Sequence, residues 1–332
     1  MKPAFPILAC ASLAALIAGQ ATAETLRVLS AWDQNFVFNK TMLEPLLEKI
    51  ETATGGDISF TVNGPEVVPT FEQFEPVQAG AFDMLFAHPG YFSGDAGLGV
   101  TIDAIDPDPV ARRESGIWDY MDEYYQARGL KLISMPPQGE NGLLFVTKDP
   151  LPESDKPFAG LKLRANVTYH ALVETLGGAP VLMSGGEIYP GLQAGLIDGA
   201  AWSVVGVTDF KLNEVAGYWT EPSYGQTGTI VLMNLDSWKN LPDEARAAIE
   251  TAGLETEKET MALYGQLNDR ERELMAEAGM QPTRYTDAVA AKLNDLWAEG
   301  VWSLGDEKAG VDAAAFREFA ASKGMTPAAA AE

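Results

Sequence analysis

Arg164 and Trp202 are the residues whose types and positions are best suited to bind a ligand. Arg164 lies in a short run at residues 161–165, and Trp202 lies in a second run at residues 200–205. An arginine guanidinium donates two parallel hydrogen bonds to a carboxylate, and an indole ring supplies a flat wall beside it. The alternatives are a surface ion pair for Arg164 and a core position for Trp202. These residue types predict a site for an organic anion.

Strands and short helices alternate around these two residues. We expect strands at residues 161–165, 181–183 and 200–205 and helices at residues 169–176 and 186–194. Gly177 and Gly178 end the first of these helices, as glycine often does. The alternation predicts a parallel sheet with right-handed crossovers, whose ligands bind beyond the carboxyl ends of the strands. Arg164 and Trp202 can therefore face one crevice.

The first part of the chain has a similar pattern. We expect strands at residues 25–30, 58–62 and 83–87 and helices at residues 39–52 and 69–79. About 300 residues also exceed what one hydrophobic core usually covers, so two lobes are predicted. The fold class is α/β, with a mixed, mostly parallel sheet flanked by helices in each lobe and a ligand cleft between the lobes.

Several further residues could reach this cleft. Near the ends of the first-lobe strands lie Trp32, Asn35, Glu66, His88 and Tyr91. Each of these could instead belong to a loop or to the core. Asn141 and Asn166 could hydrogen-bond a keto or hydroxyl group of the ligand.

The remaining segments connect and brace the lobes. We expect a helix at residues 110–127, strands at 131–135, 142–146 and 229–234, and helices at 286–302 and 312–322. Residues 242–279 form one predicted helix, in which Leu254 and Met261 could pack while Glu and Arg face water. At about 1.5 Å per residue this helix can run along both lobes. Lobe I is predicted to comprise residues 24–141 with about 230–275, and lobe II about 142–229 with 276–332.

The first 23 residues are typical of a signal peptide. Lys2 precedes an apolar run at residues 5–18, and Ala21-Thr22-Ala23 is a small-x-small cleavage site. Cleavage before Glu24 predicts a periplasmic protein, and removal of Cys10 leaves a mature chain without cysteine. No later apolar stretch is long enough to span a membrane, so we expect no membrane insertion of the mature chain.

Composition and motifs exclude several function classes. The 47 acidic and 23 basic residues give a formal charge of -24, which disfavours nucleic acid and anionic lipid as partners. The sequence contains no P-loop, Gly-x-Ser-x-Gly or dinucleotide-binding glycine motif. His88 and His170 lack the spacing of metal ligands. We therefore expect neither an enzyme nor a metal site.

The residues around Arg164 resemble the signature of the periplasmic solute-binding proteins of TRAP transporters (tripartite ATP-independent periplasmic carriers). The matching segments are residues 160–164, 178–180, 187–195 and 197–199. The resemblance implies a non-enzymatic, two-lobed receptor that closes on a small organic anion and delivers it to integral membrane subunits of a TRAP transporter. It also implies that Arg164 clamps the substrate carboxylate.

Other segments resemble the branch of this family that binds 2-oxo acids and related monocarboxylates. They are residues 64–69, 78–80, 83–84, 91–92 and 185–189. Tyr91 and Trp202 match this branch, but Ala201 replaces a glutamate that helps to hold a cation beside the ligand. This replacement disfavours a bound cation, and we expect no other cofactor. A second arginine of sialic-acid-type members falls near Leu144, and Gly185 takes the place of their pocket phenylalanine. Both differences disfavour a large polyhydroxy acid.

These residues predict a small, partly apolar monocarboxylate as the ligand, because one arginine matches one carboxylate. The alternative function is a periplasmic sensor or adaptor that acts through a protein partner and uses the acidic surface for docking. Saturable binding of a small molecule would favour the receptor. Co-purification with one receptor ectodomain would favour the adaptor.

Overall fold

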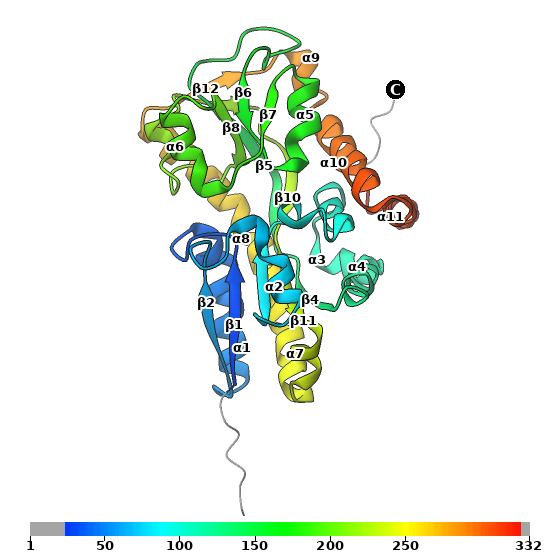
Figure 1. Ribbon diagram of the computed structural model, residues 1–332. Helices are drawn as coiled ribbons and strands as arrows, with labels where there is room; N and C mark the ends of the chain where they lie inside the picture. The colour runs from blue at the N-terminus through cyan, green and yellow to red at the C-terminus, as the bar shows by residue number, and fades with distance from the viewer. Residues whose placement is uncertain (1–23, 327–332) are drawn as a thin grey trace, which may run out of the picture.

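The computed structural model describes residues 24–326, and these residues form two lobes, each built around its own sheet. Figure 1 shows the lobes one above the other, with the sheet that contains β1 in the lower lobe and the sheet that contains β6 in the upper lobe. We call them lobe I and lobe II. The predictions for the signal peptide and for Cys10 lie outside the described residues.

The sheet of lobe I has the order β2-β1-β3-β11-β4. Its strands are β1 (Glu24–Ser30), β2 (Ile58–Asn63), β3 (Met84–Ala87), β4 (Leu130–Ser134) and β11 (Ile230–Asn234). β1 pairs in parallel with β2 and β3, and β11 runs antiparallel to both of its neighbours. The strand predicted at residues 229–234 therefore returns to lobe I.

The sheet of lobe II has the order β12-β9-β5-β8-β6-β7, with β10 also paired to β5. Its strands are β5 (Pro137–Thr147), β6 (Lys162–Arg164), β7 (Ala179–Val181), β8 (Gly199–Ser203), β9 (Tyr218–Glu221), β10 (Tyr224–Gly228) and β12 (Gln281–Arg284). β5 runs antiparallel to β8, β9 and β10, and the other pairs are parallel. This arrangement confirms the prediction of an α/β fold with a mixed sheet in each lobe. The sheets are not mostly parallel, because β5 and β11 run antiparallel to all their neighbours and each sheet has as many antiparallel as parallel pairs.

Helices cover both sheets. They are α1 (Glu44–Ala53), α2 (Phe74–Gln78), α3 (Pro109–Glu114), α4 (Ile117–Gln126), α5 (His170–Thr175), α6 (Ile188–Gln193), α7 (Leu235–Asn240), α8 (Asp243–Glu277), α9 (Asp287–Ala290), α10 (Leu293–Ala309) and α11 (Val311–Ser322). The prediction of one helix at residues 110–127 is wrong. Gly116, with φ of 85°, separates α3 from α4, because glycine adopts this left-handed conformation without steric cost.

Short helical turns follow several strands. A π-helical turn, η1 (Asn39–Leu43), leads into α1, and the 3-10 turns are η2 (Thr70–Glu72), η3 (Pro89–Phe92), η4 (Gly97–Ala104), η5 (Val167–Tyr169), η6 (Gly185–Glu187) and η7 (Leu212–Glu214). η3 follows β3 and η5 follows β6. Both turns therefore lie at the carboxyl ends of parallel strands.

The long helix α8 joins the two lobes. It packs on α1 and β4 of lobe I and on β5 of lobe II, and Figure 1 shows it passing behind both. Its extent agrees with the predicted helix, but its buried face does not. Leu254 and Met261 are half-buried, whereas the buried positions include Thr256, Glu257 and Glu271.

A second connection runs along one side of the molecule. α10 packs on η4, which follows the lobe I strand β3, and also on α5 of lobe II (Figure 1). The lobe boundaries predicted from the sequence stay a prediction.

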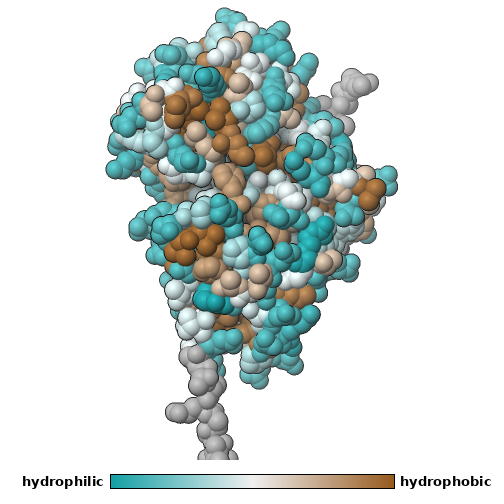
Figure 2. Space-filling view, viewed as in Figure 1, coloured by the Kyte–Doolittle hydropathy of each residue, from teal (hydrophilic) through white to brown (hydrophobic). Residues whose placement is uncertain are grey.

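Between Glu24 and Thr326 no helix combines the length and the apolar character needed to cross a bilayer. Figure 2 shows a mainly hydrophilic surface on the face that it presents, with apolar patches on both lobes near their junction. The large exposed apolar side chains include Val67 and Phe71 in lobe I and Leu182 and Leu196 in lobe II.

Candidate ligand-binding site

The carboxyl ends of four strands meet between the lobes. Trp32 and His88 follow β1 and β3 of lobe I, whereas Arg164 and Ser203 are the last residues of β6 and β8 of lobe II. These ends enclose a cavity of about 30 Å³, which we call the Arg164 cavity. It is lined by Trp32, Phe38, His88, Tyr91, Gln138, Arg164, Asn166, Tyr169, Trp202, Ser203 and Thr227. Its position agrees with the general location of ligand sites in open α/β sheets.

Arg164 is almost completely buried, with 1% of its surface exposed. Its Nε donates to the carbonyl of Met183 at 2.9 Å, and its Nη1 donates to the carbonyl of Ala201 at 3.1 Å. Its Nη2 has no hydrogen-bond partner among residues 24–326. Two fixed nitrogens hold the guanidinium in one orientation, and the third is free to donate into the cavity that Arg164 lines.

Aromatic rings from both lobes surround the guanidinium. The Cζ atom of Arg164 lies 4.9 Å from the ring centre of Trp202, within the range of a cation–π contact. The Trp202 ring is nearly parallel to that of Phe38 in lobe I, with centres 6.3 Å apart. Phe36 of lobe I stacks on Phe210 of lobe II with centres 4.2 Å apart. These contacts hold the two lobes against each other beside the cavity.

Tyr91 and Trp32 form the lobe I side of this wall, with ring centres 6.0 Å apart. Burial raises the pKa of the Tyr91 hydroxyl, and the positive charge of Arg164 acts in the opposite direction. Tyr91 is therefore a neutral hydroxyl at physiological pH. It can donate a hydrogen bond to an anion that Arg164 holds.

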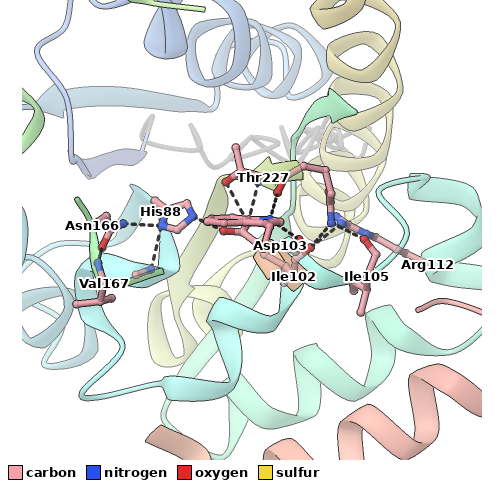
Figure 3. Close-up of polar contacts among 12 residues, drawn as sticks. His88, Ile102, Asp103, Ile105, Arg112, Asn166, Val167 and Thr227 are labelled. Atoms are coloured by element: carbon pink, nitrogen blue, oxygen red, sulfur yellow. Dashed lines mark hydrogen bonds and ion pairs between the residues drawn. The ribbon is translucent and has the colours of Figure 1, made fainter. Parts of the chain in front are cut away.

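A chain of hydrogen bonds ties His88 into the protein (Figure 3). His88 Nε2 lies 2.9 Å from Asp103 Oδ2, and His88 Nδ1 accepts from the backbone N–H of Gly90 at 3.0 Å. The side-chain nitrogen of Asn166 also lies 3.0 Å from His88 Nδ1. Since Nδ1 faces two donors, the network requires the tautomer with the proton on Nε2. The contact with Asn166 joins lobe I to lobe II.

Asp103 is buried and fully occupied by donors. Besides His88, its carboxylate accepts from the hydroxyl of Thr227 at 3.0 Å and from the N–H of Gly228 at 3.1 Å. We call His88, Asp103, Asn166 and Thr227 the paired network. Its polar groups have their partners within the protein, so it positions the cavity wall without requiring a ligand.

Five other buried side chains that line the same cavity differ from the paired network. Each has a polar atom without a hydrogen-bond partner within the described part of the chain: Trp32 Nε1, Gln138 Oε1, Arg164 Nη2, Trp202 Nε1 and Ser203 Oγ. We call these residues the unpaired set. Three of the five atoms are N–H donors, and buried donors are costly to leave without an acceptor. The arrangement suits a group rich in acceptors, such as a carboxylate.

The structure brings together most of the residues that the sequence suggested. The residues that line the Arg164 cavity are Arg164, Trp202, Tyr91, Trp32, His88 and Asn166. Asn35, Glu66 and Asn141 do not line it. Asn35 is exposed in the turn after β1, Glu66 is exposed and accepts from the N–H of Gly64, and Asn141 lines grooves elsewhere.

Sequence reasoning missed five of the lining residues: Phe38, Gln138, Tyr169, Ser203 and Thr227. Ser203 directly follows Trp202 in the predicted strand, so its position was available from the pattern. Gln138 and Thr227 lie in the paired strands β5 and β10, at positions outside the predicted strands. No cluster of three or more His, Cys, Asp or Glu residues suited to a metal ion occurs between Glu24 and Thr326.

A two-lobed α/β fold with a cavity at the strand ends between its lobes defines the class of hinged binding proteins. Solved structures agree with this class. A TRAP periplasmic solute-binding protein from Desulfovibrio salexigens, with bound orotic acid, is 19% identical, has a TM-score of 0.79 and covers 90% of this chain and 98% of that one. DctP7 from Bordetella pertussis, which binds pyroglutamic acid, is 17% identical and has a TM-score of 0.77. The match covers 90% of this chain and 100% of DctP7.

Residues 108–301 match the family "Bacterial extracellular solute-binding protein, family 7", and the chain belongs to this family. The resemblance to TRAP solute-binding proteins is thereby confirmed. The ectoine-binding protein TeaA of Halomonas elongata is 33% identical over 39% of this chain and 37% of its own length. The monocarboxylate 2-oxoacid-binding protein all3028 of Nostoc is 27% identical over 68% of this chain and 64% of its own length. The chain thus matches about a third to two thirds of these relatives' length.

Proposed function

We propose that this protein is a periplasmic receptor that captures a small organic acid and delivers it to the integral membrane subunits of a TRAP transporter. The observation that carries this proposal is the guanidinium of Arg164, which is 1% exposed and has a free Nη2 within residues 24–326. A buried guanidinium nitrogen without a hydrogen-bond acceptor is costly. A ligand carboxylate would offset this cost, and membership of a solute-binding family supports the same role.

Ligand capture requires the lobes to move. The Arg164 cavity has room for about two water molecules, so an organic acid enters when the lobes separate. A bound acid would contact Arg164 and Trp202 of lobe II together with Trp32 and Tyr91 of lobe I. Because these contacts form together when the lobes close, the ligand stabilises the closed state.

The ligand is a small, partly apolar monocarboxylate. The single guanidinium of the cavity matches one carboxylate, and a second full charge would meet a protein whose formal charge is -24. Phe38 and Tyr169 supply apolar surface for a short substituent. The names of the relatives that bind monocarboxylate 2-oxoacids and pyroglutamic acid support this ligand class.

The protein has no catalytic role in this proposal, and its chain is exported with cleavage before Glu24. Binding needs no cation, because Ala201 has no side-chain oxygen and its carbonyl already accepts from Arg164. We predict the same affinity after treatment with a chelator and in sodium-free buffer. Calorimetric titration in the two buffers measures this, and a strict requirement for calcium or sodium would contradict it.

A thermal-shift screen of mono- and dicarboxylates tests the receptor proposal. A ligand that binds the folded state raises the melting temperature by mass action, by an amount that grows with its concentration. We expect small monocarboxylates to give saturable shifts and dicarboxylates to give smaller ones. Turnover of the stabilising acid would indicate an enzyme. Absence of any shift, with co-purification of one membrane receptor, would favour the adaptor.

A further inference from the structure

Gln138 enters the Arg164 cavity from the strand that connects the two lobes. It is the second residue of β5, which follows the lobe I strand β4 and joins the sheet of lobe II. Pro137 pairs with Gly228 of β10, so Gln138 lies beside Thr227, which also lines the cavity. With 2% of its surface exposed, Gln138 forms part of the cavity wall between the lobes.

Three other polar side chains that line the cavity, Thr227, His88 and Asn166, already have hydrogen-bond partners. Thr227 donates its hydroxyl to Asp103, His88 Nδ1 faces the N–H of Gly90, and Asn166 accepts from the N–H of Val167 through its side-chain oxygen. The Gln138 Oε1 atom, in contrast, has no hydrogen-bond partner between Glu24 and Thr326. Turning the amide over would exchange its oxygen and nitrogen, but the side chain would still carry an acceptor to be satisfied.

The amide oxygen of Gln138 differs chemically from the rest of the unpaired set. Arg164, Trp32 and Trp202 present N–H donors, and the hydroxyl of Ser203 can act in either role. A carboxylate with a neighbouring oxo group has acceptors alone, so it satisfies the three N–H donors and leaves Gln138 Oε1 without a donor. A hydroxyl or N–H group beside the carboxylate supplies that donor.

We propose that Gln138 makes the receptor select acids that carry a hydrogen-bond donor, a hydroxyl or an N–H, beside the carboxylate over the corresponding oxo acids. This inference rests on the proposed function and names the ligand class more narrowly. A buried acceptor that stays unpaired on binding weakens the complex, and the scale of such losses is about tenfold or more in affinity.

The test uses pairs of acids that differ by the donor alone. Calorimetric titration compares lactate with pyruvate, 2-hydroxyisovalerate with 2-oxoisovalerate, and mandelate with phenylglyoxylate, using the full mature chain. For each carbon skeleton that binds, we expect the hydroxy acid to bind about tenfold or more tightly. In Gln138→Met, which keeps the length of the side chain without its amide, the two members should bind within about threefold of each other.

The outcomes separate this inference from the receptor proposal. Equal or tighter binding of the oxo acid by the wild-type protein would overturn the role of Gln138 and leave the receptor intact. The same preference in Gln138→Met would overturn it too. If no acid of any pair binds the wild-type protein, both proposals fail. The wild-type comparison needs no variant, so it remains decisive if Gln138→Met does not fold.

Discussion

Arg112 and Arg164 are buried to the same extent, with 1% of each exposed, yet their surroundings differ. All three nitrogens of Arg112 donate to backbone carbonyls, with Nε 2.8 Å from Asp106 O, Nη1 3.4 Å from Met135 O and Nη2 3.3 Å from Ile102 O (Figure 3). Arg164 makes two such bonds, and its Nη2 has no partner within residues 24–326. The fold therefore provides an acceptor for every side-chain nitrogen of Arg112, whereas it leaves one nitrogen of Arg164 without an acceptor.

Charges near Arg112 complete its environment. Burial lowers the pKa of its guanidinium to about 10, while the carboxylates of Glu257, Asp103 and Asp106 act in the opposite direction. The protein therefore supplies both hydrogen-bond acceptors and negative charge to Arg112. At Arg164 it supplies carbonyls and an aromatic wall. The carboxylate of Glu187 also acts on Arg164, since Arg164 helps to lower the pKa of that carboxyl, but it forms no hydrogen bond to the guanidinium. The difference indicates that the hydrogen-bond acceptor for Arg164 Nη2, which residues 24–326 do not supply, comes from outside the chain.

The same contrast extends to the neighbours of each arginine. The paired network around Asp103 has its partners within the protein, and the unpaired set around Arg164 has polar atoms left over. The unpaired set and three members of the paired network, His88, Asn166 and Thr227, line the same cavity. The two groups therefore have different roles in it. The paired network holds the walls in place, and the unpaired set is left to bind the ligand.

The largest expected effect comes from replacing Arg164 with methionine. The variant should lose about 2–5 kcal/mol of binding free energy, the range for truncating one partner of a buried charge pair. That loss corresponds to roughly 30-fold to several thousand-fold in affinity. Calorimetric titration with the best acid from the thermal-shift screen measures it. Near-wild-type affinity would exclude Arg164 as the clamp.

Arg164→Lys serves as the control for charge alone. Lysine keeps the positive charge but lacks the planar fork that donates two parallel hydrogen bonds. We expect this variant also to bind poorly, while its melting curve stays cooperative. Full affinity in the lysine variant would mean that charge without geometry is sufficient.

Arg112→Met is the matched substitution at the arginine whose three nitrogens all have acceptors within the protein. It removes one donor from each of three backbone carbonyls, although Ile102 O still accepts from the Gln226 side chain, and it takes a positive charge away from Asp103. We therefore expect stability to fall by about 2–4 kcal/mol. The affinity of the folded variant should be unchanged. Urea unfolding measures the first quantity and calorimetry the second. A variant that keeps its stability but binds weakly would reverse our assignment of the two arginines.

The alternation of strands and helices was sufficient to predict the candidate site in part. Arg164, Tyr91 and His88 lie at or just after strands whose residue patterns are visible in the sequence. Because carboxyl ends of parallel strands share one edge, their convergence follows from the topology. The same rule wrongly placed Asn35 and Glu66 in the site. Both are exposed, since a residue after a strand can equally turn towards solvent.

Other parts of the site depend on contacts that no local pattern records. Thr227 lies in β10, whose sequence Tyr-Gly-Gln-Thr-Gly has no alternation, and β10 is held by pairing with the distant strand β5. Asp103 lies in the apolar turn η4 and is held by donors from two lobes. On α8, hydrophobicity pointed to Leu254, whereas the buried face carries Glu257. A polar group can be buried here because a distant part of the chain supplies its hydrogen-bond partner, and the local sequence does not show that partner.

A smaller effect is expected where the paired network crosses between the lobes. Asn166→Ala removes the hydrogen bond of 3.0 Å to His88, which joins lobe II to lobe I. Since the ligand binds the closed state, we expect affinity to fall about 2- to 10-fold, the equivalent of roughly 0.5–1.5 kcal/mol.

Asn35→Ala is the matched control for this prediction, because Asn35 is exposed and does not line the cavity. Calorimetry should find its affinity unchanged. If both alanine variants bind like the wild type, the contact between His88 and Asn166 contributes nothing to closure. If Asn35→Ala also binds weakly, the first turn after β1 takes part in the site after all.

The smallest expected effect is on stability, and it concerns a buried carboxylate that is hydrogen-bonded within the protein. Glu271 of α8 is 7% exposed and accepts from the N–H and the hydroxyl of Thr208 at 2.7 and 2.8 Å. Burial raises the pKa of its carboxyl, and the hydrogen bonds from Thr208 act in the opposite direction. The folded state therefore takes up a proton more readily than the unfolded state. This contribution to stability declines as the pH rises through the folded pKa.

Glu271→Gln should remove this pH dependence and keep the hydrogen bonds, because the amide oxygen can accept from the same two donors. We expect the variant to be more stable than the wild type at pH 8, by up to about 1 kcal/mol, and the gap to narrow towards pH 5. Melting temperatures of both proteins at the two pH values measure this. A variant that is less stable at pH 8 would mean that the negative charge strengthens the bonds to Thr208 by more than its burial costs. In that case a buried charge in this protein is stabilising when it is hydrogen-bonded. The Nη2 of Arg164, which has no partner within residues 24–326, would then be an even clearer sign of an external partner.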